Sequence, residues 1–268
     1  MVEFTSSAPR LGEGLPLDKM PAHWMLGRLG KRVMRPGGLG PSKRMIDKLE
    51  IDSSDDVVEM WPGLGQSTAL ALAGNPRSYL GVERGEAEAA RARTAMTRPD
   101  QRCIVAPVHQ TGLPDASASV LFGEALLTLE PATRKTQIVA EAARLLRPGG
   151  RYGIHELLLT PEGLSEKAKS EIEATLSKVL HVGARPLTHG EWNRLLSDGG
   201  FSVTAVETCP LLLLDPRTVV SDEGVAGTAA ILGRAIAHPE VLPRLASIWR
   251  TFHRYRDNLG AITLVGKC

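Results

Sequence analysis

The sequence predicts an α/β fold in which a mainly parallel sheet is covered by helices on both faces. Three observations lead to this prediction. Short apolar runs alternate with amphipathic segments along most of the chain, two of the early runs end in a glutamate, and a glycine-containing turn separates the first run from the helix after it. Repeated strand–helix units place their strands in parallel through right-handed crossovers.

The N-terminal part, residues 1–50, is expected to form an arm and a helical lid outside the sheet. Residues 1–18 are rich in Gly, Pro and Ser, which predicts a loose arm. Apolar residues then recur at helical spacing from residue 19, the Pro- and Gly-rich stretch at 35–41 interrupts them, and a second helix is expected at 42–49. The segment is also basic. A solvated helix face is the simpler interpretation of these charges, and a lid over an anionic ligand is the alternative.

Residues 51–268 are expected to form one domain with seven strands. Each predicted strand is a short apolar or β-branched run bounded by turn residues. The predicted strands are residues 56–60, 79–83, 102–107, 118–122, 151–159, 201–206 and 258–266. The predicted helices are residues 67–73, 85–96, 132–146 and 163–180, one that begins at the capping box Thr188 to Glu191, and others within about 216–256. A helical insertion at about 161–198 therefore precedes the last two strands.

The most regular of these helices is the one at 132–146. Its apolar residues, among them Ile138, Val139 and Ala142, form one stripe along the helix. The stretch at 147–150, Arg-Pro-Gly-Gly, is expected to end it, because glycine caps a helix and proline bars its continuation.

The composition excludes several classes of protein. The chain has 268 residues, a net charge of +2 and a hydrophobic content of 43%, which are ordinary values for a globular protein. Nucleic-acid binders usually carry a concentrated basic face, so no nucleic-acid partner is expected. The chain shows no signal-peptide pattern and no apolar run of about 18 residues, so we expect a cytoplasmic protein without stable membrane insertion.

The three cysteines predict neither a metal site nor a disulfide framework. Cys103, Cys209 and Cys268 are far apart, and none belongs to a CxxC pair. This usage fits a reducing compartment. No metal is therefore expected.

The turn after the first strand indicates a nucleotide-like ligand. The strand at 56–60 is followed by Gly63 and Gly65, and Ser67 then opens the next helix. Glycine has no Cβ, so a ligand can approach the backbone closely there. The helix N-terminus behind the turn offers unpaired N–H donors and a partial positive charge.

Several motifs in order along the chain resemble a class I S-adenosylmethionine-dependent methyltransferase. They are an acidic-ended strand, a glycine turn, a second acidic-ended strand, a Leu-Pro-Asp loop, and Leu-Leu-Arg-Pro-Gly-Gly before the fifth strand. The resemblance covers residues 51–206, with the final strand plausibly included. It implies a Rossmann-like, doubly wound fold, S-adenosyl-L-methionine as cofactor and methyl transfer as the reaction.

The resemblance also implies roles for individual residues. Glu83 matches the acid that accepts hydrogen bonds from both ribose hydroxyls, and Glu59 matches the acid oriented toward the methionine ammonium. Glu124, at the end of the fourth strand, borders both the methionine part and the acceptor. The cofactor-binding residues implied in this way are Glu59, Met60, Trp61, Gly63, Gly65, Glu83, Arg84, Val108 and Glu124.

The chain departs from the family pattern at two positions. Trp61 stands where the family commonly has glycine, and Pro107 stands where it commonly has an aspartate near adenine. The backbone of Val108 is the expected substitute for that carboxylate. Two alternatives therefore stay open: a methyltransferase fold that serves as a binding module without catalysis, and an NAD(P)-binding oxidoreductase. The second is weaker, because the first glycine of G-x-G-x-x-G is missing.

The sequence does not single out a catalytic base. Glu124, His155 and Glu156 are the candidates, because we expect them at the carboxyl edge of the sheet, where open α/β folds bind ligands. His155 and Glu156 are adjacent on one strand, so their side chains point to opposite faces and at most one is expected in the pocket. A buried structural role is the alternative for each.

The expected acceptor is a small, partly apolar molecule. Trp24, His155 and His181 are the candidate substrate-binding residues, with core packing as the alternative for Trp24 and a surface position for His181. The scattered cysteines weigh against methylation of arsenic, which needs clustered thiolates. A homodimer is left open.

Overall fold

A computed structural model describes residues 12–268. Residues 1–11, which make up most of the predicted arm, lie outside the described part. The strands are β1 (Asp56–Met60), β2 (Ser78–Glu83), β3 (Gln101–Val105), β4 (Ala118–Glu124), β5 (Leu146–Leu159), β6 (Leu187–Thr188), β7 (Ser202–Pro210) and β8 (Leu259–Lys267). The α-helices are α1 (Ala22–Leu29), α2 (Leu39–Leu49), α3 (Gln66–Ala73), α4 (Glu86–Ala92), α5 (Ala132–Leu145), α6 (Glu166–Leu180), α7 (His189–Asp198), α8 (Pro216–Ala237) and α9 (Leu242–Arg254). Four 3-10 helices connect them: η1 (Leu17–Lys19), η2 (Arg93–Ala95), η3 (Leu127–Leu129) and η4 (Pro239–Val241).

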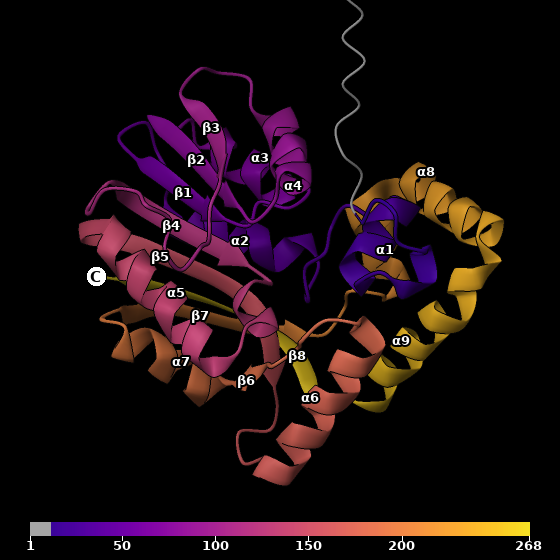
Figure 1. The fold of residues 1–268 in the computed structure, drawn as a ribbon. Coiled ribbons are helices and arrows are strands. Elements are labelled where there is room, and N and C mark those ends of the chain that lie inside the picture. Colours follow the sequence, from indigo (N-terminus) through magenta and orange to yellow (C-terminus); the bar gives the residue numbers. More distant parts are fainter. Residues whose placement is uncertain (1–11) are drawn as a thin grey trace, which may run out of the picture.

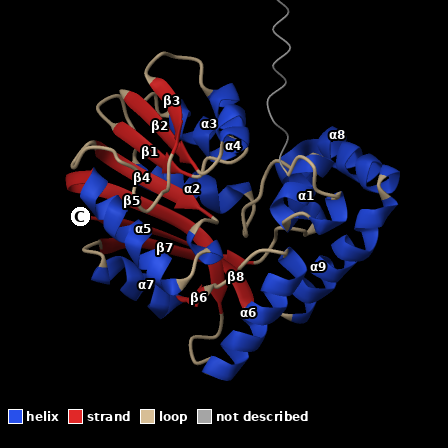
Figure 2. Ribbon diagram, viewed as in Figure 1, coloured by secondary structure: helices blue, strands red, loops and turns tan. Residues whose placement is uncertain are grey.

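Within residues 12–268 the strands form one sheet in the order β3-β2-β1-β4-β5-β8-β7, with β6 beside β5 (Figures 1 and 2). Neighbours from β3 to β5 are parallel, and β8 is antiparallel to both β5 and β7. The predicted fold class, a Rossmann-like and mainly parallel sheet with helices on both faces, is therefore confirmed. The strand number differs, because the structure has eight strands and not seven. The additional strand, β6, has two residues and is too short to leave an alternating pattern in the sequence.

Helices cover both faces of the sheet, as the alternation of side chains along each strand requires. Val57 of β1 packs with α2 and α3 on one face, whereas Val58 and Met60 pack with α5 and α7 on the other. Trp192 of α7 is fully buried in this second layer, and its indole N–H donates to the backbone oxygen of Leu157 at 2.9 Å. These two layers hold the strands rigidly and thereby position their ends.

A group of helices stands beside the carboxyl ends of the parallel strands. α1, α6, α8 and α9 pack on one another there (Figure 1). Their shared core contains Met25 and Leu29 of α1, Ala235 of α8 and Ile248 of α9. We call these four helices the helical cap. Among the described residues, no helix is long and apolar enough to cross a membrane.

Several predicted boundaries were wrong, among them the end of β7, which lies at Pro210 and not at residue 206, and the end of α4, which lies at Ala92 and not at residue 96. Helix α2 begins at Leu39 and not at residue 42, because Pro41 falls in the first turn, where the missing N–H has no helical partner to lose. Strand β5 begins at Leu146, so the Arg-Pro-Gly-Gly stretch belongs to the strand and not to a turn before it. Gly149 has a φ of 79° and the β4–β5 pairing changes register between Ala118 and Val120, which accommodates the irregular backbone.

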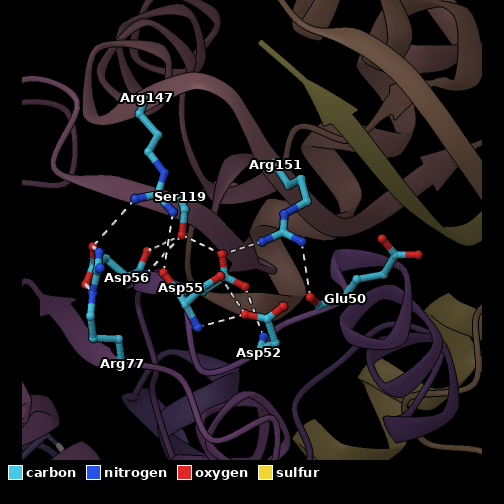
Figure 3. Close-up of polar contacts among 9 residues, drawn as sticks. Glu50, Asp52, Asp55, Asp56, Arg77, Ser119, Arg147 and Arg151 are labelled. Carbon is cyan, nitrogen blue, oxygen red and sulfur yellow. Dashed lines mark hydrogen bonds and ion pairs between the residues drawn. The ribbon is translucent and has the colours of Figure 1, made fainter.

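The amino ends of the strands are tied together by a polar cluster (Figure 3). Asp55, which precedes β1 and is buried, accepts a hydrogen bond from Ser119 of β4 at 2.6 Å and forms an ion pair with Arg151 of β5. Asp56 pairs with Arg77, and Arg147 lies within ion-pair distance of Asp56 at 3.9 Å. The cluster joins three neighbouring strands at the edge opposite the helical cap, so its charges serve the sheet and not the cleft described next.

Candidate active site

The turn between β1 and α3 has a backbone conformation that favours glycine. Trp61, Gly63 and Gly65 have φ values of 57°, 63° and 76°, all in the left-handed region. A tryptophan in this region is uncommon, since a Cβ crowds the backbone there. The backbone N–H of Trp61 donates to the oxygen of Val82 at 2.9 Å, which ties the turn to β2. This chain thus places a bulky side chain at a φ that glycine adopts more readily.

Glu83 ends β2 and faces this turn. Its side chain is buried, and its Oε1 accepts the backbone N–H of Gly63 at 2.6 Å. Burial raises the pKa of Glu83 to about 7, with the Gly63 N–H opposing and the nearby carboxylate of Glu88 adding to the rise. Glu83 therefore titrates near neutral pH beside a turn with a conformation suited to a close backbone approach.

A chain of buried hydrogen bonds crosses the carboxyl edge of the sheet. Arg35, in the segment between α1 and α2, donates from Nε to Oε2 of Glu124 at 2.7 Å and from Nη2 to Oγ of Ser67 at 3.0 Å. His155 Nδ1 lies 3.1 Å from Oε1 of Glu124 and 3.1 Å from Oγ of Ser42. Because an ionised carboxylate only accepts, the Nδ1 proton is donated to Glu124. Residues from α2, α3, β4 and β5 are thereby joined to the Arg35 guanidinium.

The Arg35–Glu124 pair carries two buried charges. Burial opposes ionisation of Glu124, but the Arg35 guanidinium and the His155 hydrogen bond outweigh it and hold the pKa of that carboxyl well below its usual range. For Arg35, burial opposes the charge, and the carboxylates led by Glu124 nevertheless raise its pKa. The pair therefore stays ionised across the physiological range.

Glu59 points into the protein. Its Oε1 accepts from Oγ of Ser67 at 2.6 Å, and its Oε2 accepts from Oγ1 of Thr68 at 2.7 Å and from the hydroxyl of Tyr79. Burial raises the pKa of Glu59, with the three hydroxyl donors opposing the rise. Glu59 thus fixes the start of α3 and links to Arg35 through Ser67.

A cleft lies between the carboxyl edge of the sheet and the helical cap. It encloses about 1380 Å³ of empty space, open solvent at its mouth included. Its walls come from the turn after β1, the ends of β2, β4 and β5, the segment between α1 and α2, the loop after β7, and the cap helices. A concave cleft of this kind is typical of small-molecule sites.

Six of the residues singled out by the sequence line this cleft: Trp24, Trp61, Gly63, Glu83, Arg84 and Glu124. Three of them are stacked. The Arg84 guanidinium lies over the rings of Trp61 and Trp24, 4.6 Å and 5.7 Å from their centroids. The indole N–H of Trp61 is buried and has no partner among the described residues. Such an orphaned donor at the wall of a cleft is a position that the acceptor of a ligand or a water can fill.

The other four cofactor candidates lie behind the cleft wall. They are Glu59, Met60, Gly65 and Val108, and none of them is among the residues that line the cleft. Met60 and Val108 are buried in the sheet core. Gly65 has a left-handed backbone conformation and directly precedes α3. The backbone of Val108 therefore does not reach the cleft in this arrangement.

The remaining catalytic and substrate candidates are His155 and Glu156 of β5, and His181 at the end of α6. Because successive side chains of a strand alternate, His155 and Glu156 point to opposite faces of the sheet. His155 reaches Glu124 from behind the cleft, whereas Glu156 accepts the backbone N–H groups of Leu126, Leu127 and Thr128 at 3.0, 2.8 and 2.9 Å. Glu156 thus caps η3 and does not line the cleft. His181 is the left-handed residue that ends α6, and its ring contacts the backbone of the N-terminal segment, while its neighbours Leu180 and Val182 line the cleft.

Sequence reasoning missed Arg35 and Ser67 as members of the site. Arg35 lies within a basic segment, for which a solvated face was the simpler interpretation, yet its guanidinium is buried. The signal that singles it out is the Pro-Gly-Gly stretch directly after it, which turns the chain back toward the sheet. Ser67 was noted as a helix start, and its hydroxyl in fact bridges Arg35 and Glu59.

A family model described as a methyltransferase domain matches residues 60–154, from the end of β1 to the middle of β5. Residues 60–154 thus resemble a methyltransferase domain. The matched segment of the methyltransferase domain contains the left-handed turn, Glu83 and Glu124. The segment before β1 and the helical cap, which complete the cleft, lie outside it.

Known relatives extend the match to more of the chain. An uncharacterized protein of Haemophilus influenzae is 28% identical over 219 residues, covering 80% of this chain and 85% of that protein. The 27-O-demethylrifamycin SV methyltransferase of Amycolatopsis mediterranei is 27% identical over 144 residues, or 52% of this chain and 50% of that enzyme. This chain thus matches about half the length of the second relative.

A solved structure shares the fold. Geranyl diphosphate C-methyltransferase from Streptomyces coelicolor A3(2), in complex with Mg2+, geranyl-S-thiolodiphosphate and S-adenosyl-L-homocysteine, superposes with a TM-score of 0.61. The identity is 14%, and the match covers 84% of this chain and 74% of that enzyme. The likeness shows that the two chains share a fold.

Proposed function

We propose that this protein transfers a methyl group from S-adenosyl-L-methionine to a small-molecule acceptor by in-line displacement. Bound in this cleft, the cofactor would supply an electrophilic methyl group on a sulfonium to the electron pair of the acceptor. The family match favours this methyl donor over the dinucleotide alternative. The cytoplasmic location and the homodimer stay predictions.

The residues that line the cleft fit the cofactor's chemistry. Glu83 offers carboxylate oxygens to a ribose diol, and the orphaned indole N–H of Trp61 offers a donor. The left-handed turn at Gly63 lets a ligand approach the backbone before α3. Arg35 and Glu124 present opposite charges, which suit the carboxylate and ammonium of an amino acid. The ribose and the amino-acid part of the cofactor thus have partners of suitable chemistry.

One observation carries the proposal: Glu83 and the left-handed turn are held together at the cleft wall. The 2.6 Å hydrogen bond from the Gly63 N–H to Glu83 fixes the carboxylate against the turn. A preorganised pair of this kind costs little ordering when a ligand binds.

The chain's own residues contribute mainly position and electrostatics. The buried hydrogen bonds of Glu124 to Arg35 and His155 fix its carboxylate at the end of β4. The helical cap forms one wall of the cleft and limits the access of water there, which strengthens electrostatic interactions inside. Because the Arg35 ion pair keeps Glu124 ionised, Glu124 is expected to stabilise positive charge rather than to act as a strong base.

The first test is the affinity of the Glu83→Ala variant for S-adenosyl-L-homocysteine, measured by calorimetry. We expect the affinity to fall at least tenfold, which corresponds to a loss of binding free energy on the order of 1.4 kcal/mol. The reason is that the two ribose hydroxyls lose the carboxylate that accepts their hydrogen bonds. Glu86→Ala is the matched control, since Glu86 is exposed on α4 and pairs with Arg93. An unchanged affinity of Glu83→Ala would contradict the assigned role of this residue.

The second test is the pH dependence of the same binding. The pKa of Glu83 is raised to about 7, so most of this carboxyl is protonated at pH 6 and ionised at pH 8. Only the ionised form accepts from both hydroxyls, so the affinity should rise about tenfold between pH 6 and pH 8. The Glu83→Gln variant should lose this slope. A slope that persists in the variant would assign the titration to another group.

A binding module without catalysis is the second candidate function. The observation in its favour is the stack of Arg84 on Trp61, which places a guanidinium over the residue that replaces the family's glycine. Calorimetry separates the two functions. If neither S-adenosyl-L-methionine nor S-adenosyl-L-homocysteine binds near millimolar concentration, the enzymatic proposal fails.

A further inference from the structure

The cleft has two ends that lie far apart along the sheet. Glu83 marks one end, at the carboxyl end of β2, and Leu211 and Leu213 mark the other, directly after β7. The strand order places β2 and β7 five positions apart. With neighbouring strands about 4.8 Å apart, the two ends are separated by about 24 Å. Glu124 at the end of β4 lies between them.

The charged groups are concentrated at the first end and in the middle. Glu83, Arg84 and Glu88 belong to β2 and the start of α4, and the Arg35–Glu124 pair occupies the middle. Arg32 also lines the cleft, but its charge is engaged, because its Nε donates to Oε2 of Glu223 at 3.1 Å and its backbone N–H to Oε1 at 2.8 Å.

The far end is built from hydrocarbon side chains of separate elements. Leu180 ends α6, Leu211 and Leu213 follow β7, and Ile248 and Phe252 lie on α9. Leu180, Leu211 and Phe252 pack against one buried cluster, so these side chains form a continuous wall. A charged group placed against this wall would lose its hydration without gaining a partner, which is strongly unfavourable. Apolar surface placed there is removed from water favourably.

We infer that the methyl acceptor is an uncharged, hydrocarbon-rich small molecule, with its apolar body against the wall of Leu180, Leu211, Leu213, Ile248 and Phe252 and its reacting atom toward Glu124. This inference rests on the proposed function for the position of the methyl group. It goes further in naming the class of acceptor, and it assigns specificity to residues outside the matched methyltransferase domain.

Two dyes with the same ring system provide the test. N-phenyl-1-naphthylamine is uncharged, and 8-anilinonaphthalene-1-sulfonate differs from it by one sulfonate. Fluorescence titration of the full chain, with and without saturating S-adenosyl-L-homocysteine, measures both affinities. We expect the uncharged dye to bind at least tenfold more tightly than the sulfonated dye. Equal or tighter binding of the sulfonated dye would overturn the inference.

Variants at Leu213 test whether the uncharged dye binds against the apolar wall. Leu213→Asp and the nearly isosteric Leu213→Asn should each weaken binding of the uncharged dye at least tenfold. Leu232→Asp is the matched control, because Leu232 is 59% exposed on α8 and is not part of the cleft lining. Dye binding that is unaffected by both Leu213 variants, each shown to be folded by circular dichroism, would overturn the inference. A failure of S-adenosyl-L-homocysteine to bind would instead overturn the proposed function, since the dye titration of the chain alone is independent of it.

Discussion

Glu124→Ala should lower the free energy of unfolding by about 3–5 kcal/mol, because it leaves the Arg35 guanidinium buried without its counter-charge. The two side chains are 1% and 10% exposed, so water replaces the lost carboxylate poorly. His155 also loses the acceptor of its Nδ1 proton. Urea denaturation followed by circular dichroism measures the change.

A double variant separates this structural effect from function. Arg35→Met combined with Glu124→Leu removes both charges, and we expect it to recover most of the lost stability, since apolar replacement of a buried ion pair is often close to neutral. It should not recover affinity for S-adenosyl-L-homocysteine, because both charged partners are absent. If the single Glu124→Ala variant lowers the free energy of unfolding by less than about 1 kcal/mol, the pair behaves as an exposed ion pair and the prediction is wrong.

Asp55→Ala should lower the free energy of unfolding by about 2–3 kcal/mol. Asp55 is buried at the amino edge of the sheet and holds Ser119 of β4 and Arg151 of β5 (Figure 3). The substitution leaves the Ser119 hydroxyl without its acceptor and Arg151 without its counter-charge. The expected loss is smaller than for Glu124→Ala because the side chain of Arg151 is 16% exposed and can reach water.

The control for this prediction is Asp100→Ala. Asp100 pairs with Arg98 on the surface, where both side chains are 36% exposed, so the expected change stays below about 1 kcal/mol. Asp55→Ala should also leave S-adenosyl-L-homocysteine affinity unchanged in the folded protein, because Asp55 lies at the edge opposite the cleft. A loss of affinity without a loss of stability would show that the two edges are coupled.

Much of the fold could be predicted from the sequence, because its determinants are local. β1 has the predicted bounds, Asp56–Met60, and the capping box of α7 is present as expected, with the Thr188 and Glu191 side chains each bonded to the other's backbone. Apolar periodicity and turn residues act over a few positions, so they are legible in one sequence. The start of β5 was not predictable in this way, because it depends on contacts between distant segments: Leu146 pairs with Ala118 of β4, and the backbone of Gly149 and Gly150 hydrogen-bonds with Cys268.

The candidate site could be predicted only in part. Glu83 and Glu124 follow strands whose ends meet at one sheet edge, so strand order alone places them near the cleft. Arg35 joins Glu124 across 89 residues, and no local pattern encodes that contact. The direction of Glu59 depends on three hydroxyl groups, from Ser67, Thr68 and Tyr79, that surround it after folding.

The sequence by itself determined the methyltransferase architecture, the left-handed turn and the acidic ends of β1 and β2, since these follow from periodicity, glycine placement and motif order. The tertiary structure alone decided which carboxylates face the cleft, which arginine pairs with Glu124, and that the cleft's far end is apolar. The physical reason is that burial, ion pairing and desolvation depend on neighbours from distant segments. Those neighbours meet only when the sheet and the helical cap pack together.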